Sequence, residues 1–296
     1  MDKKPKIIVI CGPTATGKSD YAVNLAKELA GLNHANSVVG RTSQSEVLGE
    51  IISADSRQVY KGLDIGSGKI TKREMKGVPH HLLDVASPKR TFSVTQYKKL
   101  ADKAIKDILS RGKTPILCGG TGFYIDAVIY DQTFPEVPPN KALRKKYSLF
   151  SAIANFKVLQ KLDPQRALTI DKHNNTRIIR AIEIATALGK VPLRYPSSRK
   201  SKYDVDWIYL DFPDEVLKQR IRIRLFARIR GIVAEVKKLH AQGVSWKKLE
   251  ALGLEYRYMA LYLQKKLTKQ EMLEGLEKAI WQYAKRQRTW FKKYAK

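Results

Sequence analysis

The strongest chemical signal in this sequence is a glycine-rich loop that matches the phosphate-binding pattern G-x-x-x-x-G-K-[ST]. Its glycines, Gly12 and Gly17, let the backbone curl so that several N–H groups point at one anion, and Lys18 adds a mobile positive charge. Ser19 supplies a hydroxyl suited to Mg²⁺, which makes it the candidate metal ligand. The candidate phosphate-binding residues are Gly12, Pro13, Thr14, Ala15, Thr16, Gly17, Lys18 and Ser19.

A carboxylate at the end of a second apolar run, Glu50–Asp55, is the next chemical signal. In a parallel sheet the carboxyl ends of the strands meet at the ligand crevice, so Asp55 is expected to face the same cleft as Lys18. It could act as a general base, hold Mg²⁺ through water, or simply cap the next turn. The segment Ser56–Tyr60 is rich in hydrogen-bonding groups and could read a polar substrate face.

The run Thr114–Cys118 predicts a third strand, which leads into Gly119–Gly122 without a carboxylate. An ATPase usually places a carboxylate at the end of such a strand to organise Mg²⁺. Its absence argues against a motor or switch ATPase. A small-molecule kinase remains open, as does an enzyme that uses the loop for a diphosphate other than that of ATP.

The elements that must position these residues alternate between strand and helix. Lys6–Cys11 predicts a buried strand before the glycine loop, and Asp20–Ala30 has apolar residues at helical spacing. A helix is also predicted within Tyr97–Arg111. This alternation predicts an α/β fold with a P-loop NTPase-like parallel sheet covered on both faces. The polar segment Gly31–Gly49 is interpreted as a loop or insert.

The alternation of predicted strands and helices ends near Phe134, where the turn-rich segment Phe134–Asn140 begins. Lys141–Leu188 is helical in pattern, whereas Trp207–Asp211 predicts a further strand of the sheet. We therefore predict the first part of the core over residues 1–133 and a helical insertion domain over 134–190. Residues 191–296 are predicted to return to the core and end in basic helices.

The charge of the chain points to a polyanionic partner. Its 296 residues include 56 Lys and Arg against 28 Asp and Glu, a formal net charge of +28. Such an excess attracts polyanions, nucleic acid first. The opening apolar run is far shorter than the roughly 20 residues of a spanning helix, so no membrane role is predicted. Cys11 and Cys118 are interpreted as core thiols, and the chain as a cytoplasmic monomer.

Two basic segments near the C-terminus allow two interpretations each. Arg220, Arg224 and Arg228 lie four residues apart on one helical face, which could be a solvated surface or could line the cleft and its RNA rim. The aromatic residues Trp281 and Trp290 are interleaved with lysines and arginines. We interpret these tryptophans as packing anchors rather than base-stacking platforms. The adjacent His80 and His81 are interpreted as turn or core residues rather than as a metal site.

Together, these motifs resemble the tRNA dimethylallyltransferase (tRNA isopentenyltransferase) family. The resemblance rests on Gly12–Ser19 followed by Ile52–Gly66, and it extends over nearly the whole chain. Further matching segments follow in order: Pro79–Asp84, Gly119–Tyr124, Asn175–Glu183 and Ala284–Phe291. Gly253–Arg257 matches a segment that usually begins Ile-Gly-Tyr in the family and reads Leu-Glu-Tyr here.

The resemblance implies transfer of a dimethylallyl group from dimethylallyl diphosphate to N6 of the adenosine on the 3′ side of the anticodon. It assigns the loop Gly12–Ser19 to the diphosphate of the donor, with Mg²⁺ as the cofactor. The implied catalytic residues are Asp55, which takes the amine proton, Thr121 at the reacting region, and Arg224 on the leaving diphosphate. The implied contacts with the tRNA anticodon stem-loop are Asp55, Ser56, Arg57, Gln58, Arg144, Thr176, Arg177, Ile178, Ile179, Arg180 and Arg257.

Two other function classes compete with this one. A nucleoside or nucleotide kinase would share the phosphate loop and Asp55, but it has no need for the large positive charge. A non-enzymatic RNA-binding protein would need the charge, but not a carboxylate beside an intact phosphate loop.

Overall fold

A parallel sheet forms the centre of the fold in the computed structural model, which describes residues 4–34, 48–192 and 200–295. Its strands follow the order β3-β2-β4-β1-β5, and every neighbouring pair is parallel. The α/β fold with a parallel sheet core is therefore confirmed. The strands are β1 (Lys6–Cys11), β2 (Gly49–Ser53), β3 (His80–His81), β4 (Thr114–Gly119) and β5 (Asp204–Tyr209).

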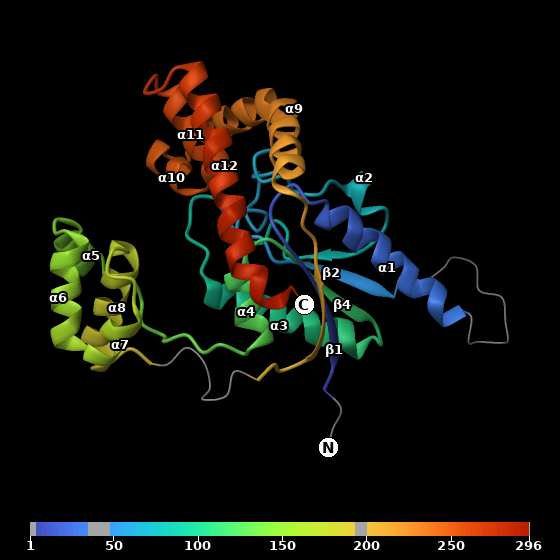
Figure 1. Cartoon of the computed structure of the whole chain (residues 1–296), viewed down its shortest axis with the longest axis horizontal. Helices are drawn as coiled ribbons and strands as arrows, with labels where there is room; N and C mark the ends of the chain where they lie inside the picture. The colour runs from blue at the N-terminus through green and yellow to red at the C-terminus, as the bar shows by residue number, and fades with distance from the viewer. Residues whose placement is uncertain (1–3, 35–47, 193–199, 296) are drawn as a thin grey trace. The chain divides into compact units, whose positions relative to one another are not determined.

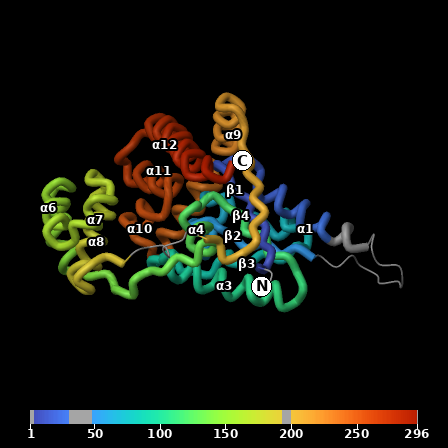
Figure 2. The backbone as a smooth tube through the Cα atoms, turned by 60° about the horizontal axis from the view of Figure 1, so that its bottom comes forward, coloured from blue at the N-terminus to red at the C-terminus, as the bar shows by residue number. Residues whose placement is uncertain are grey.

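Both faces of the central strands β1, β2 and β4 are buried, and successive side chains of each strand point to opposite faces. In β1, Ile8 and Ile10 join an apolar cluster with Ala22 and Val23 of α1 (Lys18–His34). Ile7 and Val9 join the larger cluster on the other face, which includes α3 (Val94–Ser110). Figures 1 and 2 show α1 and α3 on opposite sides of the central strands. Continuous apolar strands of this kind are typical of a sheet covered on both faces.

The C-terminal helices join the larger cluster. They are α9 (Asp214–Ala241), α10 (Trp246–Ala251), α11 (Leu254–Leu263) and α12 (Lys269–Phe291), followed by the short η1 (Lys292–Tyr294). Phe291 is fully buried, and the partly buried Trp281 and Trp290 lie against the same cluster. The interpretation of the two tryptophans as packing anchors is confirmed. Two further helices, α2 (Lys72–Met75) and α4 (Gly122–Ile129), complete this unit.

A second compact unit spans residues 132–200 and interrupts the first unit, which comprises residues 1–131 and 201–296. Its helices are α5 (Lys141–Ser148), α6 (Ala152–Leu162), α7 (Pro164–Thr169) and α8 (Asn175–Leu188). They enclose a separate apolar core around Leu159, Ile178 and Ile182. The sequence predicts an insertion over 134–190, whereas this unit spans 132–200, of which residues 193–199 lie outside the described part of the chain. Val191, just beyond the predicted end, packs against the apolar core of the unit.

Two local predictions change. Gly31–Gly49 was interpreted as a loop, but α1 continues to His34 and β2 begins at Gly49; residues 35–47 lie outside the described part of the chain. His80 and His81 form the short edge strand β3, where His81 Nε2 lies 2.8 Å from an oxygen of Glu50. Two residues are too few for a periodic strand signal. Within the described ranges, no helix has both the length and the apolar character needed to cross a membrane.

Candidate active site

A cavity of about 730 Å³ lies at the carboxyl ends of the strands. The order β2-β4-β1 places three strand ends side by side, so the loops that follow them converge. Lys18, Asp55 and Gly119 each come from one of these loops, and all three line the cavity. The expectation that Asp55 and Lys18 face one cleft is therefore confirmed, although the two residues lie far apart in the sequence.

The phosphate loop joins β1 to α1 and is closely packed. Gly12 has a φ of +142°, and a Cβ there would lie 2.0 Å from the backbone oxygen of Leu210, so only glycine fits. Pro13 O accepts hydrogen bonds from the Thr16 hydroxyl and the Lys18 ammonium. Burial lowers the pKa of Lys18 to about 8, and the nearby Arg224 adds to this effect. The lowered pKa shows that the Lys18 charge lacks full solvation here.

The arginine face of α9 lies along the same cavity. Of the two interpretations of this face, a solvated surface and a lining of the cleft, the structure favours the second. Arg220 Nε donates a hydrogen bond to Ala15 O at 2.7 Å, and Arg224 Nη1 lies 3.4 Å from the Thr14 hydroxyl. Arg228 lines the cavity further along the helix. Three guanidinium groups and the ammonium groups of Lys18 and Lys69 thus line a single space, an arrangement suited to a polyanion such as a diphosphate.

Asp55 both caps a turn and lines the cavity. Its Oδ1 accepts hydrogen bonds from the backbone N–H groups of Arg57, at 2.7 Å, and Gln58, at 3.3 Å. The capping alternative is therefore correct for one carboxylate oxygen. Both of these hydrogen bonds go to Oδ1, so they leave Oδ2 able to take up a proton. Because the turn holds the carboxylate in a fixed orientation, the cap supports a role as a positioned base.

Thr121 and Ser56 hold the Asp55 turn against the end of β4. Ser56 N–H donates to the Thr121 hydroxyl at 3.0 Å, and Thr121 N–H donates to Ala54 O at 3.0 Å. Gly119 lies so close to Ala54 that an added Cβ would come within 2.3 Å of its oxygen. The lining of the cavity includes Asp55 and Gln58 but does not include Ser56, Arg57 or Thr121. Thr121 thus supports the site from outside the lining.

The structure adds site residues that sequence reasoning missed. Gln287 of α12 is 5% exposed; its Oε1 accepts from Thr14 N–H at 2.8 Å, and its Nε2 donates to Gly120 O at 2.9 Å. Tyr283, one helical turn earlier, also lines the cavity, and burial raises its pKa. Gln287 lies in the segment Ala284–Phe291 that carried the family resemblance, and Tyr283 directly precedes it. Their spacing of four residues could have indicated a shared helix face.

Glu255 of α11 lines a smaller adjoining cavity of about 20 Å³ together with Arg224 and Arg228. Burial raises the pKa of this carboxyl, while the two arginines oppose that rise. The pair Leu254-Glu255, a departure from the family segment, thus places an acid behind the arginine face. Arg257, an implied tRNA contact, is exposed, and its Nε donates to Glu250 O at 3.0 Å.

The donor set around Ser19 suits Mg²⁺ bound mainly through a ligand and water. In the described part of the chain, no cluster of three or more His, Cys, Asp or Glu side chains could hold a metal alone. The cavity nevertheless brings the Ser19 hydroxyl and the Asp55 carboxylate together. Mg²⁺ commonly takes one or two protein oxygens and completes its shell with phosphate oxygens and water, so these residues fit it.

The implied tRNA contacts of the insertion fall into two groups. Thr176 and Arg177 are exposed and Ile179 is half-buried, whereas Ile178 is fully buried in the core of this unit. The side chain of Ile178 thus packs in the core, and the contact of the segment 176–180 with tRNA stays a prediction. Arg144 and Arg180 both bind the carboxylate of the buried Glu183, Arg144 through two nitrogens at 2.7 and 2.8 Å.

The two cysteines lie in the core, as expected from the sequence. Cys11 and Cys118 are buried free thiols at the ends of β1 and β4. Burial raises the pKa of each thiol to about 12, so neither forms a thiolate near neutral pH.

The comparisons with known proteins agree on one family. The model of the IPP transferase family matches residues 58–294. A tRNA dimethylallyltransferase 2 of Treponema denticola is 41% identical, over 100% of this chain and 94% of the relative. A tRNA dimethylallyltransferase of Anoxybacillus flavithermus is 40% identical, over 97% of this chain and 87% of the relative. The solved structure of the full-length tRNA isopentenylpyrophosphate transferase of Bacillus halodurans is 36% identical, with a TM-score of 0.68, covering 98% of this chain and 87% of its own.

Proposed function

Because this chain belongs to the IPP transferase family, we propose that it transfers a dimethylallyl group from dimethylallyl diphosphate to N6 of an adenosine in tRNA. The acceptor is the adenosine on the 3′ side of the anticodon, and diphosphate is released. The observation that carries the proposal is one cavity that brings the phosphate loop, Asp55 and Arg224 together. The kinase alternative is not favoured, since the relatives are tRNA-modifying enzymes by name.

The positive groups of the cavity suit the leaving diphosphate. When the bond between the dimethylallyl carbon and the diphosphate oxygen breaks, the electron pair and the new charge stay on the diphosphate. Lys18, Arg224 and the N–H groups at the start of α1 are positioned to stabilise that charge. Fixed donors lower the barrier most when they stabilise charge that develops only as the bond breaks.

Asp55 suits the other half of the reaction. The exocyclic amine of adenine is a weak nucleophile, and its proton becomes acidic only as the new C–N bond forms. In our proposal, Asp55 Oδ2 accepts that proton while Oδ1 keeps its hydrogen bonds to Arg57 and Gln58 N–H. Thr121 acts by holding Ser56 and so fixes the turn that carries the base.

Mg²⁺ is proposed as the cofactor, held by Ser19 and by the oxygens of the donor. When bound, the ion would neutralise part of the charge on the leaving diphosphate. The protein groups around it, Lys18 and Arg224, share the same task, so the ion and the side chains act on one ligand.

The tRNA partner is proposed to contact both compact units. The target base is stacked in an RNA loop and must be drawn out to reach Asp55, which requires a large basic surface. The net charge of +28 supplies such a surface. Lys18, Asp55 and Arg224 line one cavity within a single chain, so we propose that the protein acts as a monomer. Because its proposed substrate is tRNA, we also propose that it acts in the cytoplasm.

The proposal is tested by incubating the protein with unmodified tRNA, Mg²⁺ and radiolabelled dimethylallyl diphosphate. Label in the RNA that is released by nuclease digestion as N6-modified adenosine is the expected result. A tRNA with guanosine in place of the adenosine beside the anticodon is the matched control and should stay unlabelled. Absence of label in both tRNAs, with ATP turnover on a nucleoside, would overturn the proposal in favour of a kinase.

A further inference from the structure

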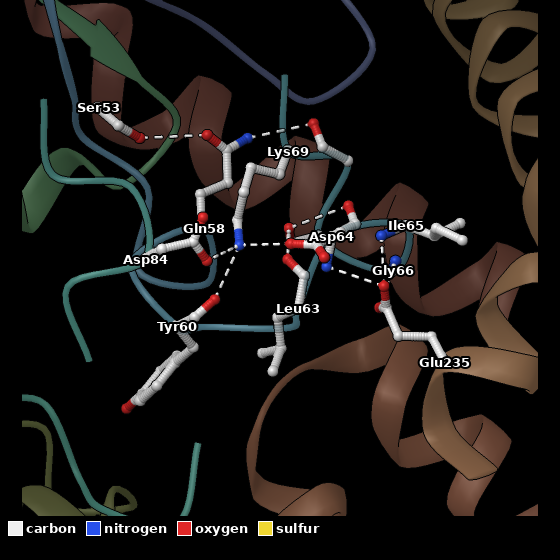
Figure 3. A network of polar contacts seen from close by, with 12 residues as sticks. Ser53, Gln58, Tyr60, Leu63, Asp64, Ile65, Gly66, Lys69, Asp84 and Glu235 are labelled. Atoms are coloured by element: carbon white, nitrogen blue, oxygen red, sulfur yellow. Dashed lines mark hydrogen bonds and ion pairs between the residues drawn. The ribbon is translucent and has the colours of Figure 1, made fainter. Parts of the chain in front are cut away.

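A buried carboxylate far from the proposed chemistry holds one wall of the cavity. Glu235 of α9 is 9% exposed, and its Oε2 accepts hydrogen bonds from the backbone N–H groups of Asp64, at 2.9 Å, and Ile65, at 2.6 Å. Its Oε1 accepts from Gly66 N–H at 2.9 Å. Figure 3 shows this carboxylate pointing at the three consecutive residues. Three backbone donors on one acceptor give a fixed arrangement of chain and side chain.

Tyr256 of α11 completes the set of donors. Its hydroxyl donates to Glu235 Oε1 at 2.7 Å and accepts from Ser67 N–H at 3.1 Å. Each oxygen of Glu235 therefore receives two hydrogen bonds. Gly66 lies against the tip of the Tyr256 ring, where an added Cβ would come within 2.5 Å of Cζ. The segment Asp64–Ser67 is thus held by two C-terminal helices through four backbone N–H groups.

One face of α9 carries both the arginines of the cavity and this carboxylate. Arg224, Arg228 and Glu235 follow one another at intervals of four and seven residues, which returns to the same face at about 3.6 residues per turn. Gly231 lies between them, and a Cβ there would come within 2.9 Å of Ile65 Cδ1. The helix therefore fixes the spacing between the arginine end of the cavity and the segment Asp64–Ser67.

The far end of the segment connects to the turn that carries the proposed base. Gln58 Nε2 donates to Gly68 O at 3.3 Å, and Gln58 N–H donates to Asp55 Oδ1 at 3.3 Å. The Lys69 side chain, only 5% exposed, donates to Tyr60 O at 2.9 Å and to Asp64 Oδ1 at 2.7 Å. Its ammonium is thus engaged in the wall, as Figure 3 shows, although Lys69 also borders the cavity.

From these contacts we infer that Glu235 is a positioning residue for the transfer reaction, acting through Asp64–Gly68 and Gln58 on the orientation of Asp55. The inference rests on the proposed function, since Asp55 is its target. Glu235 touches neither substrate in this scheme. Its contribution is to keep the base within the narrow range of geometry that the transition state requires.

The substitution Glu235→Gln tests this inference with almost no change in shape. If the NH₂ replaces Oε2, it meets the backbone N–H groups of Asp64 and Ile65, and two of the four bonds are lost. If it replaces Oε1, it meets Gly66 N–H, whereas the Tyr256 hydroxyl can turn to accept from it, so at least one bond is lost. We expect kcat to fall about tenfold or more, because small displacements of a reacting group are costly. The KM for dimethylallyl diphosphate and the Kd for inorganic pyrophosphate should stay within about threefold, since the phosphate loop is held by other contacts.

The matched control is Glu215→Gln on the same helix, whose carboxylate is 84% exposed and pairs with Lys218. Its kcat should equal that of the wild type. Tyr256→Phe is a second variant that removes one donor from Glu235 and the acceptor of Ser67 N–H, so it should give an intermediate loss of kcat. This variant decides the question if Glu235→Gln does not fold.

Two readouts separate positioning from a purely structural role. Rates are normalised to the stoichiometry of pyrophosphate binding, so a misfolded fraction does not lower the apparent kcat. Hydrogen exchange of a peptide over residues 63–69 should speed up in Glu235→Gln, whereas peptides from β1 should keep wild-type protection. A normalised kcat within twofold of wild type, with or without faster exchange, overturns the inference. A wild-type protein that transfers no label overturns the proposed function instead.

Discussion

The side-chain oxygen of Gln287 accepts a hydrogen bond from the backbone N–H of Thr14 at 2.8 Å. The amide nitrogen of the same side chain donates to Gly120 O at 2.9 Å, so one glutamine of the last long helix joins the phosphate loop to the end of β4. The Gln287 side chain is almost fully buried, and so is its hydrogen bond to Gly120 O, which therefore has no water to replace it.

Gln287→Leu should therefore weaken the binding of inorganic pyrophosphate by about tenfold, since Thr14 N–H and the buried Gly120 C=O lose their shared partner and the loop loses its fixed shape. Isothermal titration calorimetry measures this change. Gln282→Leu, an exposed glutamine on the same helix, is the control and should bind as the wild type does. Equal affinities for all three proteins would show that the loop holds its shape without Gln287.

Asp55→Asn should lower kcat by about 10²- to 10⁴-fold, the usual contribution of a positioned general base. The amide keeps an oxygen for the N–H groups of Arg57 and Gln58, so the turn survives while the proton acceptor is lost. Single-turnover transfer of label measures the rate, and tRNA affinity should stay within a few-fold. A large loss of tRNA affinity with an unchanged rate in the bound complex would contradict the role as base.

The affinity for pyrophosphate should fall as pH rises through the pKa of Lys18, which burial lowers to about 8. Below this pH the ammonium is charged and attracts the anion. Above it the charge is lost, and the affinity for pyrophosphate falls by up to about tenfold per pH unit. Bound pyrophosphate favours the charged form, so binding near pH 8 should take up a proton, which calorimetry in buffers of different ionisation enthalpy detects.

The control for this pH dependence is Lys18→Arg, because a guanidinium stays charged throughout the range. Titration of pyrophosphate itself affects both proteins equally, so the difference between their slopes isolates Lys18. Parallel slopes would mean that Lys18 does not contribute the pH dependence.

Two arginines of the insertion should behave differently on substitution. Arg177 is exposed, so Arg177→Ala should weaken tRNA binding without changing thermal stability. The slope of the logarithm of the binding constant against the logarithm of the salt concentration should become shallower by about 1. Arg144 binds the buried Glu183 through two nitrogens, so Arg144→Ala should also destabilise the insertion by about 1–2 kcal/mol. Filter binding at several salt concentrations and thermal melts of both variants test the contrast. Identical melts would refute the structural role of Arg144.

Much of the fold could be predicted from local pattern. The run Lys6–Cys11 coincides with β1, and the start of the strand at Thr114 also matches. These elements carry their signal in consecutive residues, because a strand buried on both faces must be apolar throughout. The edge strand β3 left no such signal, and the continuation of α1 to His34 was hidden by a polar sequence without periodicity.

The residues of the candidate site also fall into those with a local sequence signal and those without one. The phosphate loop and Asp55 could be predicted from local pattern, because each follows a strand whose carboxyl end must face the ligand crevice. The support that Gln287, Tyr256 and Glu235 give to that crevice follows from the folded arrangement alone. Their roles depend on contacts across more than 150 positions of the chain, made by helix faces whose orientation is set by packing against the sheet and not by any local pattern.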